Sequence, residues 1–200
     1  MANPQAQVSG VIEAEKLLER PYVAEPLRAH DCAPVGDGAA VVIIAAADRA
    51  RELCARPAWI TGFEHRIDSG ALGARDLLAV PSAAAAGLAC AAAAAACAAG
   101  ANGIGTAGAD GVEVAELHAP FTHQEILLRR ALRLGAGVDV NPSGGALCGN
   151  PMFAAGLARI GMAARAVMSG RARRALGHAT SGPALQQNLV CVMEASGETR

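Results

Sequence analysis

The residues best suited to chemistry lie in two short segments rich in histidine, amide and glycine. The first segment begins at His118, directly after VEVAEL, whose alternation is typical of a strand. The second, NPSGGALCGNP (Asn141 to Pro151), contains the Gly144–Gly145 pair and Asn150. An imidazole at a strand end and an amide in a glycine-rich turn can both donate hydrogen bonds to a carbonyl oxygen or an oxyanion. These residues indicate the polarisation of a carbonyl substrate.

Other polar residues support a site less directly. His178 and Ser181 fall in the last expected hairpin, where they could contact a substrate or simply end a strand. His123 falls in the first turn of an expected helix, where a solvated or capping role is common. The six cysteines form no CxxC pair, and each is explained as well by a small buried hydrophobic side chain. We expect no metal site.

The composition excludes several classes of partner. The net charge of −1 provides no basic surface for a nucleic-acid backbone. The run from Ser82 to Gly100 is long enough to cross a bilayer, but it is nearly all alanine, which favours a helix packed in a protein over a helix in lipid. The polar first ten residues do not resemble a signal peptide, so we expect a cytoplasmic protein with free thiols.

Apolar runs separated by helical patterns predict an α/β chain. The run AAVVIIAAA is apolar throughout and β-branched at its centre, as expected of a strand buried on both faces. Strands are expected at 39–47, 58–67, 112–118, 175–180 and 189–194, and helices at 47–54, 82–100, from Thr122, and at 152–168. A glycine-rich loop is expected at 100–111. This alternation predicts a three-layer α/β/α sandwich around a mixed five-stranded sheet, with an irregular lead-in at 1–38 and one domain at 39–200.

Four segments in this order resemble the carboxy-terminal half of thiolases, specifically the sterol-carrier-protein (lipid-transfer) branch. They span Asp31 to Ala45, Glu116 to Leu128, Asn141 to Ile160, and His178 to Glu194, and the resemblance covers nearly the whole chain. It implies a thiolase-like half-fold and an acyltransferase acting on acyl-CoA, with the coenzyme A thioester as substrate and no further cofactor. The nucleophilic cysteine of that family lies in the first half, which this chain does not match.

The resemblance assigns roles to several residues, and at other positions this chain lacks the residue that the family uses. His118 matches the histidine of the family's His-Asp-Cys-Phe loop, which stabilises an oxyanion. Ala119 and Pro120 replace the aspartate and the cysteine of that loop, so its acid/base thiol is missing. Asn150 replaces the histidine of the Gly-His-Pro loop, and an amide cannot act as a base near neutral pH. The Gly144–Gly145 pair is expected to allow close approach of the backbone to a ligand.

These observations lead to a hypothesis with two rivals. The preferred function is a thiolase-like subunit, of acetyl-CoA acetyltransferase type, that handles a lipid-like or steroid-like acyl-CoA. It would need an amino-terminal-half subunit for the nucleophile, or form a homo-oligomer, and an OB-fold acyl-CoA-binding protein is a further possible partner. The rivals are a retro-aldol acyl-CoA lyase of the same fold, and a non-catalytic protein: a structural subunit, a truncated remnant or an acyl-CoA carrier.

Overall fold

A mixed five-stranded sheet organises the chain, in the order β3-β7-β6-β4-β5. The computed structural model describes residues 3–99 and 111–196. β3 pairs antiparallel with β7 and β7 with β6, whereas β6, β4 and β5 run parallel to one another. The strands are β3 (Trp59–Ile67), β4 (Val114–Glu116), β5 (Asp139–Val140), β6 (Arg174–Ser181) and β7 (Gln187–Glu194).

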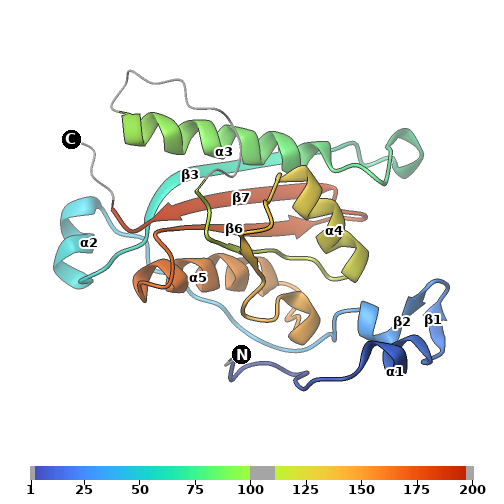
Figure 1. Cartoon of the computed structure of the whole chain (residues 1–200). Coiled ribbons are helices and arrows are strands. Elements are labelled where there is room, and N and C mark those ends of the chain that lie inside the picture. The colour runs from blue at the N-terminus through green and yellow to red at the C-terminus, as the bar shows by residue number, and fades with distance from the viewer. Residues whose placement is uncertain (1–2, 100–110, 197–200) are drawn as a thin grey trace.

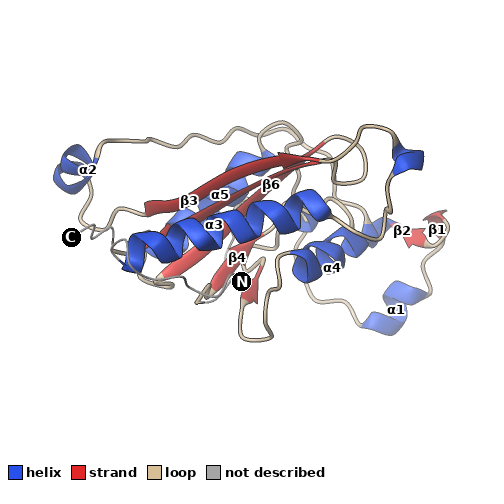
Figure 2. Ribbon diagram, turned by 90° about the horizontal axis from the view of Figure 1, so that it is seen from above, coloured by secondary structure: helices blue, strands red, loops and turns tan. Residues whose placement is uncertain are grey.

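Helices cover both faces of this sheet and make the expected three layers (Figures 1 and 2). Helices α3 (Pro81–Ala99) and α4 (Thr122–Ala131) lie on one face, and α5 (Ala155–Met168) lies on the other. Two buried clusters result, one between α3, α4 and the sheet and one between α5 and the sheet. The predicted α/β/α architecture is therefore confirmed.

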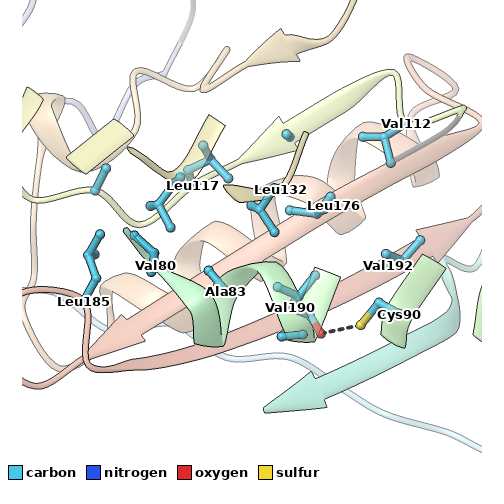
Figure 3. Packing of buried hydrophobic residues seen from close by; sticks show 14 of the residues in the cluster. Val80, Ala83, Cys90, Val112, Leu117, Leu132, Leu176, Leu185, Val190 and Val192 are labelled. Atoms are coloured by element: carbon cyan, nitrogen blue, oxygen red, sulfur yellow. Dashed lines mark hydrogen bonds between the residues drawn. The ribbon is translucent and has the colours of Figure 1, made fainter. Parts of the chain in front are cut away.

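Small side chains let α3 lie close to the sheet. Ala83, Ala86 and Cys90 are completely buried against residues such as Val190 and Val192 of β7 (Figure 3). The Cys90 thiol donates a hydrogen bond to the Val190 carbonyl oxygen (3.2 Å), and burial raises its pKa to about 12. Cys90 is therefore a packing residue. Among the described residues, the helices fall short of the length and apolarity that crossing a membrane requires.

The amino-terminal part contains only short elements. Its elements are α1 (Ala14–Leu18), β1 (Tyr22–Ala24), β2 (Leu27–Arg28) and a 3-10 turn (Ala29–Asp31). β1 and β2 form a separate two-stranded hairpin. Helix α2 (Ala47–Leu53) follows where the sequence predicts it, and a second 3-10 turn spans Leu72–Ala74. The glycine-rich loop expected at 100–111 lies outside the described residues, except for Gly111.

The prediction of a buried strand at 39–47 is wrong. Residues 39–46 have no regular secondary structure, and Val41 and Ile43 are 86% and 89% exposed. This segment lies on the far side of α5 from the sheet, so it has no neighbouring strand to pair with (Figure 1). The fifth strand is instead β5, two residues long, which the sequence analysis missed because so short a strand has no visible alternation.

We predict that Gly62→Ala destabilises the chain by about 1–3 kcal/mol. A Cβ at Gly62 would lie 2.7 Å from the Cys90 carbonyl oxygen and 3.0 Å from its Cα, and neither backbone atom of α3 can move freely. Gly73→Ala is the matched control, because a Cβ there meets nothing within 4 Å. Urea unfolding of both variants measures the difference, and equal midpoints would contradict close packing of β3 on α3.

Candidate active site

The candidate site lies where three parallel strands end. His118 follows β4 by two residues, Asn141 directly follows β5, and Thr180 is the penultimate residue of β6. Because parallel strands end at one edge of a sheet, these residues from distant parts of the sequence come together. This edge is a common location for ligand sites in open α/β sheets.

His118 and Asn150 form a buried pair. The His118 Nε2 atom lies 3.3 Å from the Asn150 Oδ1 atom, and each residue is only 6% exposed. The backbone N–H of Thr180 donates to His118 Nδ1 (3.4 Å). With Nδ1 accepting, Nε2 carries the proton and donates to the Asn150 oxygen. The Asn150 amide nitrogen then makes no hydrogen bond within the described part of the chain and is available as a donor.

The electrostatic environment keeps His118 neutral. Burial lowers the pKa of His118, and the nearby Arg159 charge lowers it further, while the hydrogen bond that Nε2 donates to Asn150 opposes the shift. A neutral imidazole with Nδ1 already occupied is suited to holding Asn150 rather than to accepting a proton from a substrate.

A buried polar cluster lies beneath this pair. The Glu116 carboxylate accepts hydrogen bonds from the Ser143 hydroxyl (2.6 Å) and backbone N–H (3.0 Å), and lies 3.2 Å from Arg159 Nη1. Arg159 Nη1 also donates to the Ser143 hydroxyl oxygen (2.7 Å). Burial raises the pKa of Glu116, and Ser143 and Arg159 oppose that shift. The Glu116–Ser143–Arg159 cluster links β4, the glycine-rich loop and α5.

The glycine pair forms a fixed turn near this cluster. Gly144 and Gly145 have φ angles of 93° and 61°, and a Cβ at Gly145 would lie 2.9 Å from the Asn141 side chain. The Asn141 Oδ1 atom accepts from the Leu117 backbone N–H (2.6 Å), and its Nδ2 atom donates to Glu125 (2.7 Å). The turn is thus held against the segment that carries His118. No hydrogen bond between described residues joins either glycine to His118 or Asn150.

His178 is completely buried in β6. Its Nε2 atom is 2.9 Å from Asn188 Oδ1, and Asn188 Nδ2 donates to the Ser82 hydroxyl (2.7 Å), which donates to Asp68 (2.6 Å). Burial lowers the pKa of His178 to about 4, and the hydrogen bond with Asn188 opposes that shift. The structure therefore places His178 in a separate buried network without contact with solvent, and no hydrogen bond between described residues joins it to His118 or Asn150.

The remaining predicted residues lie further out. Ser181 is exposed at the end of β6, one residue beyond Thr180, and His123 is exposed in the first turn of α4. The segment after the two short amino-terminal strands crosses the site loops: Ala33 N–H donates to the Pro120 carbonyl oxygen (2.7 Å), and Val35 pairs with Asn150. Within residues 3–99 and 111–196, no group of three or more His, Cys, Asp or Glu side chains could hold a metal ion.

Several site residues were missed by the sequence analysis. Glu116, Arg159 and Ser143 complete the buried cluster, and Asn188 orients His178. A signal for the ion pair was present: Glu116 lies in an apolar strand and Arg159 in an apolar helix, and charges in such places are buried only when paired. Nothing in the sequence indicated that these two residues face each other.

The fold is that of thiolases. The structure superposes on human mitochondrial 3-ketoacyl-CoA thiolase, solved in complex with CoA, with a TM-score of 0.66 and 21% identity, covering 98% of this chain and 44% of that chain. The sequence is 28% identical to an acetyl-CoA acetyltransferase of Methanothermobacter thermautotrophicus, over 78% of this chain and 43% of that relative. No family model matches the chain. The chain thus spans less than half the length of these relatives, and the two matches together support a place in the thiolase superfamily.

We predict that His178 makes the chain less stable as the pH falls. Its pKa is about 4 in the folded chain against 6.5 for a free imidazole, so between these values the unfolded chain binds more protons. Stability should fall by about 3 kcal/mol from pH 6.5 to pH 4 through this group alone, with no contribution above that window and no further loss below it.

The measurement is denaturant unfolding between pH 4 and 7. In His178→Asn the free energy of unfolding should vary less steeply with pH, by up to one bound proton per molecule, whatever the effect of the substitution on absolute stability. His65→Gln, at an exposed position of β3, is the control for the loss of a histidine. An unchanged slope in His178→Asn would show that His178 is not buried as a neutral group.

Proposed function

We propose that this chain is a thiolase-type subunit that polarises the carbonyl group of an acyl-CoA thioester. The observation that carries the proposal is the buried His118–Asn150 pair, in which the Asn150 amide nitrogen makes no hydrogen bond within the described residues. The CoA thioester is the substrate, and no further cofactor is assigned. The relatives are named acetyl-CoA acetyltransferase and 3-ketoacyl-CoA thiolase, which supports this substrate class.

The proposed mechanism divides the work between two polypeptide halves. The Asn150 N–H would donate to the thioester oxygen as negative charge develops there, and His118 would hold the amide in that orientation through Nε2. By resemblance, Gly144, Gly145, Ser181 and His178 are assigned to the substrate-binding side, although His178 is completely buried and would act only through its neighbours. A thiolase-type amino-terminal half would supply the attacking cysteine, and a homo-oligomer is the alternative assembly.

Two further assignments belong to the same proposal. By resemblance, the substrate is a lipid-like or steroid-like acyl chain of the sterol-carrier-protein branch, and an OB-fold protein that binds acyl-CoA is a candidate partner. The expected compartment is the cytoplasm. The domain carrying this function is 39–200, with residues 1–38 as a lead-in whose end lies against the site loops.

A retro-aldol lyase is the second candidate, and one observation favours it. Where thiolases of this branch carry an acid/base cysteine and a histidine, this chain has Pro120 and Asn150. Retro-aldol cleavage of a 3-hydroxyacyl-CoA needs stabilisation of a thioester enolate and a base for the hydroxyl proton, but no cysteine nucleophile. The Asn150 donor serves that enolate equally well. A non-catalytic subunit is the alternative if neither reaction occurs.

We predict that Asn150→Ala lowers kcat/KM by about 100-fold to 1,000-fold in the chain paired with a thiolase-type amino-terminal half. The loss follows from removing a donor to the developing oxyanion. His118→Ala should cause a similar loss, because the amide would no longer be oriented. The assay measures thiolysis of acetoacetyl-CoA by CoA and, separately, cleavage of a 3-hydroxyacyl-CoA.

His123→Ala is the matched control, because this histidine is exposed at the start of α4 and should leave the rate unchanged. Full activity in Asn150→Ala would remove the amide from the mechanism. A wild-type pair that cleaves neither substrate would favour the non-catalytic alternative.

A further inference from the structure

One edge of the sheet is a long strand that has a neighbour on one side only. β3 is the outermost strand at this edge, and among the described strands it pairs with β7 alone (Figure 2). A bulge interrupts the pairing between Ile60 and Gly62, and from Gly62 to Ile67 the pairing is regular. Along such a strand the backbone groups point alternately toward the neighbouring strand and away from it, so every second residue presents its N–H and C=O groups at the edge.

Two hydrogen bonds show which residues of β3 face outward. The Asp68 N–H donates to a carbonyl oxygen of the β6–β7 hairpin (2.8 Å), so the backbone of this residue faces inward. The His65 carbonyl oxygen accepts a hydrogen bond from the Arg66 side chain (3.0 Å), as expected of a group at the free edge. Because the direction alternates along the strand, Phe63, His65 and Ile67 present their backbone groups to the outside.

The side chains at this edge are arranged symmetrically about His65. Glu64 and Arg66 flank it on one face of the sheet and form an ion pair with each other. Phe63 and Ile67 flank it on the other face and are 57% and 58% exposed. In an antiparallel pair of two identical strands centred on His65, Glu64 of one strand lies opposite Arg66 of the other, and Phe63 lies opposite Ile67. Each of these residues therefore meets a complementary one.

We propose that β3 pairs antiparallel with β3 of a second copy of this chain, with the twofold axis passing through His65. The two sheets then form one continuous sheet across the axis. A twofold contact of this kind requires a surface that is complementary to itself, and the charges and apolar side chains around His65 meet that requirement. The inference does not depend on the proposed function, because β7 and β6 separate β3 from the strand that precedes His118.

The alternative explanation of Glu64 and Arg66 is protection of the edge against pairing, which is a common role of charges on edge strands. Repulsion between copies requires charges of one sign to lie opposite each other. Here the two charges have opposite signs, and the register centred on His65 brings unlike charges together. The sequence from Gly62 to Ile67 also contains no proline, which would block pairing.

The test exchanges the two charges, and sedimentation equilibrium of the purified chain measures the result. The wild-type chain should dimerise reversibly in the micromolar range, as expected of a small contact. Glu64→Arg places an arginine opposite Arg66 in both symmetry-related pairs, so it should weaken dimerisation about tenfold or more, and Arg66→Glu should do the same. The double variant Glu64→Arg with Arg66→Glu reverses both signs and should restore the wild-type affinity to within about threefold.

Two controls separate loss of the contact from loss of the fold. Arg49→Glu breaks an exposed ion pair with Glu52 on α2, away from β3, and should leave dimerisation unchanged. Urea unfolding of the single variants at Glu64 and Arg66, below the dimer dissociation constant, should give midpoints close to that of the wild type. An exposed ion pair contributes little to the stability of one chain.

Hydrogen exchange at low and high protein concentration gives a second measurement. The amides of Phe63, His65 and Ile67 should exchange at least about tenfold more slowly in the dimer, because they become hydrogen-bonded across the axis. The amides of Glu64 and Arg66 already face β7, so their exchange should not depend on concentration.

Restoration of the dimer by the double variant, together with protection of the three outward amides, would establish the contact. A chain that stays monomeric at millimolar concentration would overturn the inference, as would a dimer that both single variants leave unchanged. A dimer that the single variants weaken and the double variant fails to restore would show that the register centred on His65 is wrong.

Discussion

The position of the candidate site depends on one buried ion pair. Glu116 and Arg159 are almost completely inaccessible, and Ser143 hydrogen-bonds to both. Removing one partner of such a pair leaves an uncompensated charge in the interior, at a cost of about 3–5 kcal/mol. Glu116 is the last residue of β4 and lies two residues before His118. Ser143 belongs to the loop before Asn150 and Arg159 to the helix after it, so the cluster holds these three elements together. The two site residues are therefore positioned by elements that this ion pair holds together.

This constraint produces a site built from hydrogen-bond donors. The Thr180 N–H occupies His118 Nδ1, so the imidazole holds the Asn150 amide and is not free to move a proton. The buried thiols offer no nucleophile there: burial raises the pKa of Cys90 to about 12 and that of Cys191 to about 11. The Cys148 thiol is buried and donates to the Gly145 carbonyl oxygen. A site lined by these hydrogen-bond donors can stabilise an oxyanion, but catalysis requires a reactive group from elsewhere.

The sequence predicted most of the fold because apolar periodicity is a local property. Four of the five strands and all the long helices lie close to their expected positions, and the thiolase-like α/β/α architecture is confirmed. The sequence also singled out His118 and Asn150, which the structure brings together. It could not show the pairing of Glu116 with Arg159, 43 residues away, because that contact depends on how α5 crosses β4. Nor could it show that His178 faces Asn188 inside a hairpin.

The failed prediction at 39–47 follows from the local nature of sequence patterns. The pattern of Val41 to Ile44 is typical of a strand, but a local pattern cannot specify whether a sheet edge is within reach of it. Within this chain α5 separates the segment from the sheet, so Val41, Ile43 and Ile44 stay exposed. The position of a strand therefore depends on contacts that are distant in the sequence, as the pairing of Glu116 with Arg159 does.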